Sequence, residues 1–221
     1  MIPKVAVSLF LGVLTLHVEA RAQTVTACDE LASHPADSGS VGSGIEFSEI
    51  DAPSAISACE QARREYPDQP RFTYLLGRST HASGDVAEAV RLYKVAAREH
   101  YPFAVFTMAK IYAGGATGYD DPEEAFHWNL RAANLGFLEP KGYVGIALIE
   151  GRGVGKDEEE GIQWIKEAAE EGYADAQLFL STVFANGELL PKDLDESVRW
   201  LEEAAESGHP VAIDILNAFG D

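Results

Sequence analysis

Basic residues are scarce in this 221-residue chain. Its 17 lysines and arginines stand against 36 aspartates and glutamates, which gives a formal net charge of −19. Nucleic acids and anionic membrane surfaces would repel such a chain, so neither is expected as a partner. Part of the acidity falls at predicted helix starts, as in residues 157–160 (DEEE), where negative charge is favourable. The acidity therefore indicates solvated helix surfaces and not a particular ligand.

The sequence also lacks the motifs of catalysis and of metal binding. No Ser, Cys or His lies in a pattern typical of a nucleophile or an acid–base pair. The glycines of residues 151–155 (GRGVG) follow no strand pattern, so they do not predict a phosphate-binding loop. His127 and His209 have no ligand at a metal spacing, and Asp120 and Asp121 belong to no calcium-loop motif. We therefore expect no enzymatic activity, no metal and no cofactor.

Long apolar runs are absent except at the start of the chain. Lys4 precedes an apolar run over residues 5–16, and residues 20–22 (ARA) offer small side chains for cleavage. A membrane anchor would need about 20 apolar residues, and His17 interrupts this run. Residues 1–22 are therefore predicted to be a cleaved signal peptide, which leaves a periplasmic or secreted protein of a Gram-negative-type bacterium that begins at Gln23.

Cysteine is scarce as well, with only Cys28 and Cys59 in the chain. An exported protein with two cysteines most simply joins them, and the enclosed loop of about 32 residues would contribute about 3–4 kcal/mol of stability. A second interpretation is a lipid on Cys28, because residues 25–28 (VTAC) resemble a lipoprotein-processing box, although the box lies far beyond the apolar run. A reactive or metal-binding pair would usually show a C-x-x-C spacing, which is missing.

A repeat of 36 residues dominates the rest of the chain. Residues 121–136 (DPEEAFHWNLRAANLG) return in nearly the same form at 157–172 and 193–208, with Asp, Glu, Trp, an alanine pair and Gly at matching positions. A weaker version occupies residues 85–100, with His100 where the other units have Gly. A fixed period of this length is typical of an array of stacked helical units.

Each repeated residue predicts a part of one helix. The Asp is expected to cap the helix, with the Glu three positions later reaching back in a capping box, and the Gly is expected to end it. The tryptophans Trp128, Trp164 and Trp200 share a stripe with the alanine pairs, which predicts packing between helices and not a sugar-stacking ladder. A second apolar helix pattern follows each Gly, so each period is helix, loop, helix and turn.

The region between the cysteines carries no period. Residues 35–44 are polar and glycine-rich, which predicts a surface loop, and Asp51 then begins a helix that runs to Tyr66. This half repeat, pinned by the disulfide, is expected to cap the array. The predicted organisation is a signal peptide at 1–22, a capping segment at 23–70, a shorter repeat at 71–100, full repeats at 101–136, 137–172 and 173–208, and a C-terminal capping helix at 209–221.

The pattern A-x-x-W-x-x-x-A-A-x-x-G, the 36-residue period and the loop at residues 151–157 (GRGVGKD) resemble Sel1-like repeats, whereas residues 71–100 have the shorter spacing of a tetratricopeptide repeat. The resemblance implies an all-α, right-handed α-solenoid whose first helices line a concave face. It also implies a scaffold or adaptor that binds a protein or peptide, with roles in bacterial envelope signalling, polysaccharide export or host contact among exported members. Some relatives linked with cell-wall fragments have a disulfide in each repeat. Because this chain lacks that feature, a cell-wall-fragment-binding protein or hydrolase is kept only as the alternative to the scaffold.

The phase of the repeat predicts which side chains face the concave groove. Gly77, Ala109, Gly145, Ser181 and Asn217 align as small or polar residues where the two helices cross. Positions six and three before and one after these residues fall on the groove side. The predicted partner-binding residues are Arg71, Tyr74, Arg78, Phe103, Phe106, Lys110, Glu139, Asp175, Leu178, Thr182 and Asp214. An aromatic and basic early end is typical of a binding surface; the alternative is that Phe103 and Phe106 are core residues between repeats.

The C-terminal residues 209–219 form a lone first helix with no second helix after it. This helix is expected to cap the stack. An apolar face left exposed there would offer a surface for a second copy of the chain, so a homodimer through the C-terminal helix is a further hypothesis.

Overall fold

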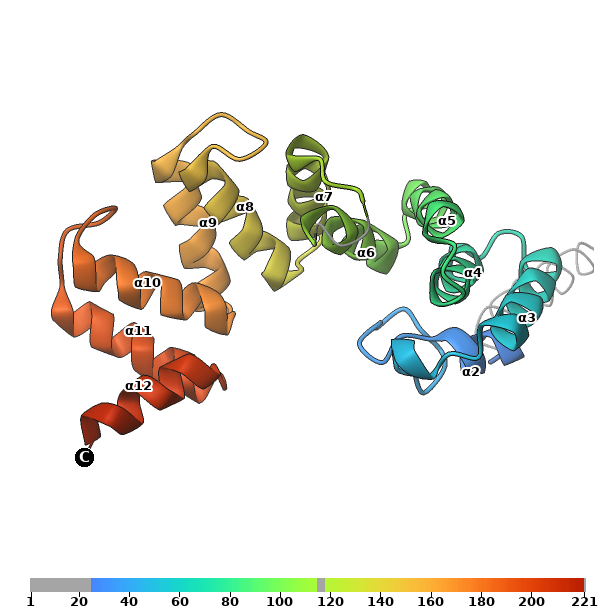
Figure 1. The fold of residues 1–221 in the computed structure, drawn as a ribbon, viewed down its shortest axis with the longest axis horizontal. Coiled ribbons are helices and arrows are strands. Elements are labelled where there is room, and N and C mark those ends of the chain that lie inside the picture. Colours follow the sequence, from blue (N-terminus) through green and yellow to red (C-terminus); the bar gives the residue numbers. More distant parts are fainter. Residues whose placement is uncertain (1–24, 115–117, 221) are drawn as a thin grey trace, which may run out of the picture. The chain divides into compact units, whose positions relative to one another are not determined.

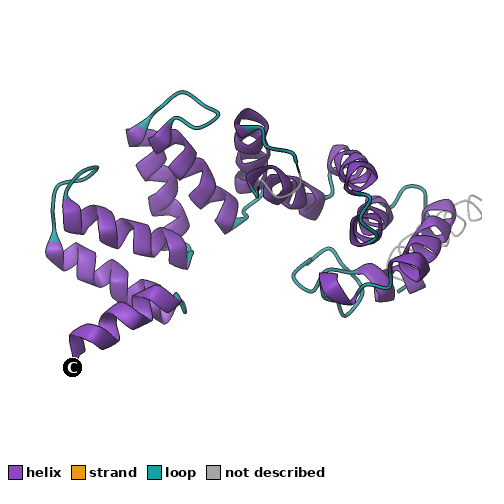
Figure 2. Ribbon diagram, viewed as in Figure 1, coloured by secondary structure: helices purple, strands orange, loops and turns teal. Residues whose placement is uncertain are grey.

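The structure, a computed structural model, describes residues 25–114 and 118–220, which form eleven α-helices, one short 3-10 helix and no strand (Figures 1 and 2). The predicted signal peptide lies outside the described residues. The chain divides into two compact units, Met1–Ala104 and Val105–Asp221. In the described residues of both units helices follow one another along the chain, and the fold is an α-solenoid, as the repeat predicts.

The amino-terminal unit begins with a short helix and an irregular stretch before its longer helices. Its elements are α2 (Ala27–Ala32), the 3-10 helix η1 (Phe47–Glu49), α3 (Ala52–Glu65), α4 (Pro70–Ala82) and α5 (Val86–Arg98). Helix α4 packs against both α3 and α5, and α2 packs against α3 and α4. The core of this unit therefore centres on α4.

The carboxy-terminal unit contains the regular repeats. Its helices are α6 (Pro102–Ala113), which begins at the end of the first unit, α7 (Pro122–Asn134), α8 (Leu138–Glu150), α9 (Glu158–Glu170), α10 (Ala174–Asn186), α11 (Leu194–Glu206) and α12 (Pro210–Gly220). From α7 to α12 each helix packs against the next one in the chain. By the phase of the 36-residue repeat, α8 and α10 are first helices and α7, α9 and α11 are second helices.

The repeated aspartates cap their helices as predicted. The Asp121 carboxylate accepts the backbone N–H groups of Glu123 and Glu124, both at 3.1 Å, and Asp85, Asp157 and Asp193 cap in the same way. The predicted return bond from the Glu is wrong for these helices. Glu124 instead accepts the indole N–H of Trp128, at 2.9 Å, and its counterparts in α5 and α11 pair with arginines one turn further on. The Glu therefore fixes a side chain of its own helix.

Each second helix ends in a left-handed residue, as the repeated Gly predicts. Gly136, Gly172 and Gly208 have φ values of 91°, 94° and 87°, and His100 takes the same place with φ of 64°. The N–H of the following residue bonds back into the last helical turn, for example from Phe137 to the Ala132 carbonyl at 3.2 Å. This bond is typical of the Schellman motif, in which glycine is favoured because it has no Cβ.

We expect His100→Gly to raise the free energy of unfolding by about 0.5–1 kcal/mol. The left-handed conformation costs an L-residue about 1–2 kcal/mol; glycine avoids this cost but loses more backbone entropy when the chain folds, which offsets part of the gain. The His100 side chain is exposed, so its removal leaves no cavity. Urea denaturation measures the change. Gly136→His is the matched control and should lower stability by a similar amount; a destabilised His100→Gly variant would contradict this account of the turn.

The helix crossings confirm the phase of the repeat alignment. At the α8–α9 crossing, a Cβ on Gly145 would lie 2.7 Å from the Gly161 carbonyl oxygen, so only glycine fits there. One period later Ser181 and Ser197 meet, with their hydroxyl oxygens 3.4 Å apart. In the first unit, a Cβ on Gly77 would lie 2.9 Å from the Tyr93 ring. Gly77, Gly145 and Ser181 therefore lie where first and second helices approach each other.

The tryptophans pack between helices, as predicted. Trp200 belongs to a core cluster with Ile165 and Leu180, and Trp164 covers a second cluster that contains Val144. Trp128 is also buried. These contacts exclude an exposed stacking ladder.

Candidate interaction surface

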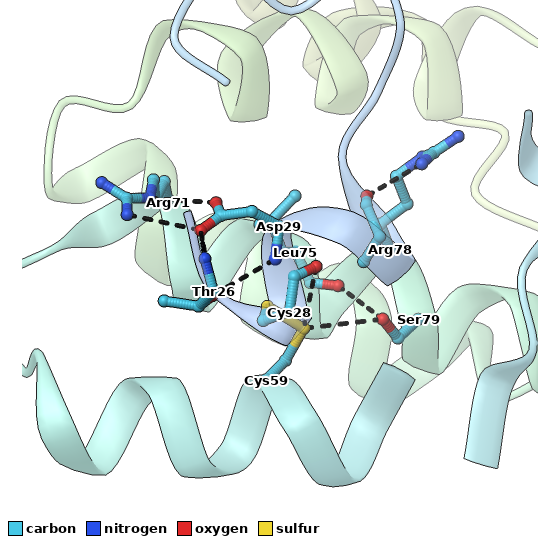
Figure 3. Close-up of a disulfide and its surroundings, with 9 residues drawn as sticks. Thr26, Cys28, Asp29, Cys59, Arg71, Leu75, Arg78 and Ser79 are labelled. Atoms are coloured by element: carbon cyan, nitrogen blue, oxygen red, sulfur yellow. Dashed lines mark hydrogen bonds and ion pairs between the residues drawn. A yellow bond between two sulfur atoms is a disulfide. The ribbon is translucent and has the colours of Figure 1, made fainter. Parts of the chain in front are cut away.

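A disulfide joins Cys28 of α2 to Cys59 of α3, as the sequence predicts (Figure 3). Both cysteines are fully buried. Since the Cys28 sulfur is bonded to Cys59, it cannot also carry the lipid considered from the sequence. The disulfide fixes the start of the irregular amino-terminal stretch to a long helix.

We call residues 25–50 the N-terminal strap. The strap comprises α2, a loop and η1, and α2 lies against α3 and α4. Its loop returns on itself through a hydrogen bond from the Ile45 N–H to the Ser33 carbonyl at 2.8 Å. Asp37 is buried, so the stretch predicted to be a surface loop, residues 35–44, is exposed only in part.

An ion pair joins the strap to the first turns of α4. The Arg71 Nε lies 3.1 Å from Asp29 Oδ1, and a second nitrogen lies 3.4 Å from Oδ2 (Figure 3). Thr26 also donates its N–H and its hydroxyl to Asp29 Oδ2, both at 2.9 Å. Asp29 is fully buried and Arg71 nearly so. A paired carboxylate with several donors is the arrangement that a buried charge requires.

Two turns further along α4, Arg78 binds backbone carbonyls of the strap. Its guanidinium donates to the Ala32, Ser33 and Ile45 oxygens at 2.8, 2.7 and 2.5 Å. Only 3% of Arg78 is exposed, and this burial lowers the pKa of the guanidinium from its ordinary value. Arg78 thus recognises main chain, whereas Arg71 recognises a carboxylate.

A third polar contact lies at the end of the unit. The Tyr101 hydroxyl donates to Asp37 Oδ2 at 2.6 Å. Burial raises the pKa of the Asp37 carboxyl, and burial together with this hydrogen bond raises the pKa of Tyr101. The Tyr101 ring packs against the Tyr74 ring with centroids 5.2 Å apart, and the His34 ring of the strap packs against the Phe103 ring with centroids 4.7 Å apart.

These contacts correct the predicted groove at its early end. Arg71, Tyr74, Arg78 and Phe103 were predicted to face a partner, yet all four are buried in the structure. The physical reason is the strap, whose non-periodic residues contact this side of the unit and satisfy both arginines. Phe103 is a core residue, which is the alternative that the sequence left open.

In the carboxy-terminal unit, three predicted groove residues come together. Phe106 of α6 stacks on Phe137 with ring centroids 4.7 Å apart, and the Lys110 amine lies 5.4 Å from the centre of the Phe106 ring. Lys110 also pairs with both carboxylate oxygens of Glu139 at 3.2 Å. About half of the Lys110 and Glu139 side chains is exposed, at 55% and 48%. The result is an accessible aromatic and charged cluster between α6 and α8.

The later predicted residues are more dispersed. The Asp175 carboxylate on α10 lies 3.3 Å from Nε2 of His209, at the start of α12. Leu178 is half-buried against the cluster of α11 and α12, and the exposed Thr182 donates its hydroxyl to the Leu178 carbonyl at 3.1 Å. Asp214 is exposed on α12.

A row of rings at the start of the first helices was not predicted from the sequence. Tyr101, Phe137, Tyr173 and His209 recur every 36 residues, each directly after the left-handed residue. Phe137 stacks on Phe106, and the Tyr173 ring occupies the space beside Gly142, where a Cβ would lie 2.7 Å from Cε1. The same period that revealed the tryptophans could have revealed this row, which packs one repeat against the preceding first helix.

The described residues contain no group of three or more His, Cys, Asp or Glu side chains that could hold a metal ion. Within the same part of the chain, no helix is both long and apolar enough to cross a membrane.

Comparison with protein families gives four matches to the Sel1 repeat, over residues 74–101, 102–137, 143–173 and 174–209. The first match covers the unit whose spacing suggested a tetratricopeptide repeat. No curated protein matches the chain by sequence.

Two solved structures of Sel1-like repeat proteins are similar. One, a Sel1 repeat protein from Oxalobacter formigenes, is 28% identical with a TM-score of 0.64, over 76% of this chain and 69% of that protein. The other, c5321, a protective antigen of uropathogenic Escherichia coli strains, is 23% identical with a TM-score of 0.64, over 73% of this chain. This chain covers only 35% of the Escherichia coli protein, which supports the fold alone.

Proposed function

The chain belongs to the Sel1 repeat family, and from this premise we propose that it is an exported, non-enzymatic scaffold that binds a partner protein or peptide along α6, α8 and α10. Sel1 repeats indicate a protein-interaction scaffold, and Sel1 repeat proteins are generally non-catalytic. To this we add an exported location, a binding face on α6, α8 and α10, and a protein or peptide as the partner.

The observation that carries the proposal is the position of the strap in the amino-terminal unit. There, a first helix, α4, already holds a polypeptide segment through the ion pair between Arg71 and the Asp29 carboxylate and through three hydrogen bonds to main-chain carbonyls. Helices α6, α8 and α10 occupy the equivalent place in later repeats. Their equivalent faces are therefore the best candidates for a segment of another protein.

The side chains on these helices have the chemistry of a binding surface. The cluster of Phe106, Lys110 and Glu139 combines an aromatic ring with two accessible charges, and Thr182 is exposed on α10. Aromatic side chains at the centre of a contact, surrounded by polar groups, are typical of residues that dominate binding energy. The opposite charges of Lys110 and Glu139 would select the register of the partner.

Export is supported by the signal-like first 22 residues and by the disulfide, since disulfides persist in oxidising compartments. A periplasmic or secreted scaffold would fit envelope signalling, polysaccharide export or host contact. The mass of the chain recovered from the periplasm or the medium tests export, because it should correspond to a start at Gln23.

The binding face is tested with two exposed substitutions and a matched control. We expect Lys110→Glu, which places a negative charge beside Glu139, and Thr182→Arg, which places a long side chain on α10, each to weaken capture of the partner from an envelope extract at least tenfold. Val198→Arg is the control, because Val198 is exposed on the second helix α11. All three substitutions lie on the surface, so circular dichroism should show unchanged helix content.

If all three variants captured the partner equally weakly, or if only Val198→Arg captured less of it, binding would have to lie on another face. Turnover of a cell-wall fragment by the purified chain would favour the alternative, a hydrolase or wall-binding protein, over the scaffold.

The homodimer through the C-terminal helix stays a prediction. Val211 and Ile213 of α12 are exposed, at 50% and 39%, which is compatible with a docking face. A light-scattering mass of one chain at high concentration would count against it.

A further inference from the structure

The amino-terminal unit contains a second feature that the proposed groove does not use. Two arginines, Arg71 and Arg78, project from α4 and are 6% and 3% exposed. Arg78 donates three hydrogen bonds to carbonyl oxygens of the strap, and Arg71 forms an ion pair with the Asp29 carboxylate of the strap. A chain with a net charge of −19 thus buries two positive charges under its own first segment.

A cap does not need this chemistry. Burying a guanidinium carries a desolvation cost, and apolar side chains of similar size usually stabilise a buried contact as well as or better than an ion pair does. Arginine is instead the side chain suited to reading carboxylates and backbone oxygens in a fixed geometry. The α4 face therefore carries side chains of the kind that recognise a peptide.

The strap binds this site in the manner of a ligand. It presents one carboxylate to Arg71, three main-chain oxygens to Arg78 and a second carboxylate, that of Asp37, to Tyr101. The disulfide tethers it beside the site, and tethering gives a segment an effective concentration in the millimolar range. A free peptide of similar chemistry would be excluded as long as the tether holds the strap in place.

We infer that the α4 face is a second binding site, specific for a peptide that presents an acidic residue in a short helical turn and backbone carbonyls at the end of that turn, and that the strap keeps this site closed. The inference concerns a different helix from the proposed partner groove and does not depend on it. A partner segment would replace the Asp29 carboxylate at Arg71 and the strap carbonyls at Arg78.

A peptide of residues 25–50 with Cys28→Ser, carrying a fluorescent label, is the probe. The closed protein is the mature chain with its disulfide. The opened protein is the same chain with Cys28→Ser, Cys59→Ser and Asp29→Lys, so that its own strap is untethered and repelled by Arg71. We expect the opened protein to bind the peptide at least tenfold more tightly than the closed protein does, by fluorescence anisotropy.

A charge exchange provides the matched control. A peptide that also carries Asp29→Lys should not bind the opened protein. It should bind at least in part when the opened protein carries Arg71→Glu together with Asp29→Ala in place of Asp29→Lys, so that the protein's own strap offers no charge to Glu at position 71. Equal binding of both peptides, or equal binding by open and closed protein, would overturn the inference. Loss of the helical circular dichroism of the opened protein would also overturn it, since a strap that cannot leave without unfolding is a structural element and no gate.

Amide hydrogen exchange on the unaltered chain gives a second measurement. Strap amides with main-chain hydrogen bonds, such as those of Ser33 and Ile45, should exchange through a local opening at least tenfold faster than the buried amides of α4. Exchange of both sets at one common rate would contradict a strap that opens by itself.

Discussion

Removal of the disulfide, through Cys28→Ala with Cys59→Ala, is expected to lower the free energy of unfolding of the amino-terminal unit by about 3–4 kcal/mol. The bond closes a loop with a sequence separation of 31 residues, and most of its effect comes from the restriction of the unfolded chain. The disulfide joins the strap to α3, so the attachment of the strap is the feature most affected. Urea denaturation followed by far-ultraviolet circular dichroism measures the change.

The tryptophans supply an internal control for this experiment. All three, Trp128, Trp164 and Trp200, lie in the carboxy-terminal unit, so their fluorescence reports that unit alone. We expect the fluorescence midpoint to move much less than the circular dichroism midpoint. A shift of less than about 1 kcal/mol in both signals would mean that the strap is held without the disulfide.

Replacement of Arg78 is expected to have an effect of similar size. Arg78→Met keeps most of the side-chain volume but leaves the carbonyls of Ala32, Ser33 and Ile45 without their donor. Each buried acceptor left unpaired costs about 1–3 kcal/mol, so a loss of about 3–5 kcal/mol in the stability of the amino-terminal unit is expected once water reaches some of them. Urea denaturation with circular dichroism measures the loss.

Arg91→Met is the matched control for Arg78→Met. Arg91 pairs with Glu88 on the surface of α5, with 62% of its side chain exposed. Exposed pairs of this kind contribute about 0–1 kcal/mol, so this variant should unfold close to the parent. If both variants lost the same small amount, the hydrogen bonds of Arg78 to the strap would not hold it in place.

The repeat made much of the fold predictable, because a period reports the same physical requirement several times. Asp121 and its equivalents each cap a helix, and Gly145 and Ser181 each lie where two helices cross. An assignment of helix phase from one unit would be uncertain by several residues. Agreement among successive units placed Gly77, Gly145 and Ser181 correctly at the helix crossings. The groove residues drawn from the same phase did not hold at α4 and Phe103, which are buried.

The strap could not be predicted by the same reasoning. Residues 25–50 carry no period, and the contact between Asp29 and Arg71 spans 42 residues of sequence. A groove drawn from repeat phase alone therefore left α4 uncovered and assigned its arginines to a partner. The cysteine spacing predicted that this region is pinned, but it did not indicate what the pinned residues cover.

The difference in burial between Phe103 and Phe106 also could not be predicted from the sequence. Both residues fit a groove or a core, and their neighbours decide the outcome. Phe103 meets Tyr74 and the strap residue His34, whereas Phe106 meets Phe137 and the exposed Lys110. The two are three positions apart on one helix and still differ in burial, since Phe103 is 5% exposed and packs against the strap residue His34, whereas Phe106 is half-buried.

Hydrogen exchange on the complex with the captured partner shows whether the first helices of the carboxy-terminal unit hold the partner. Binding is expected to slow exchange in α6, α8 and α10, with little change in α7, α9 and α11. Slowed exchange confined to the second helices would contradict it.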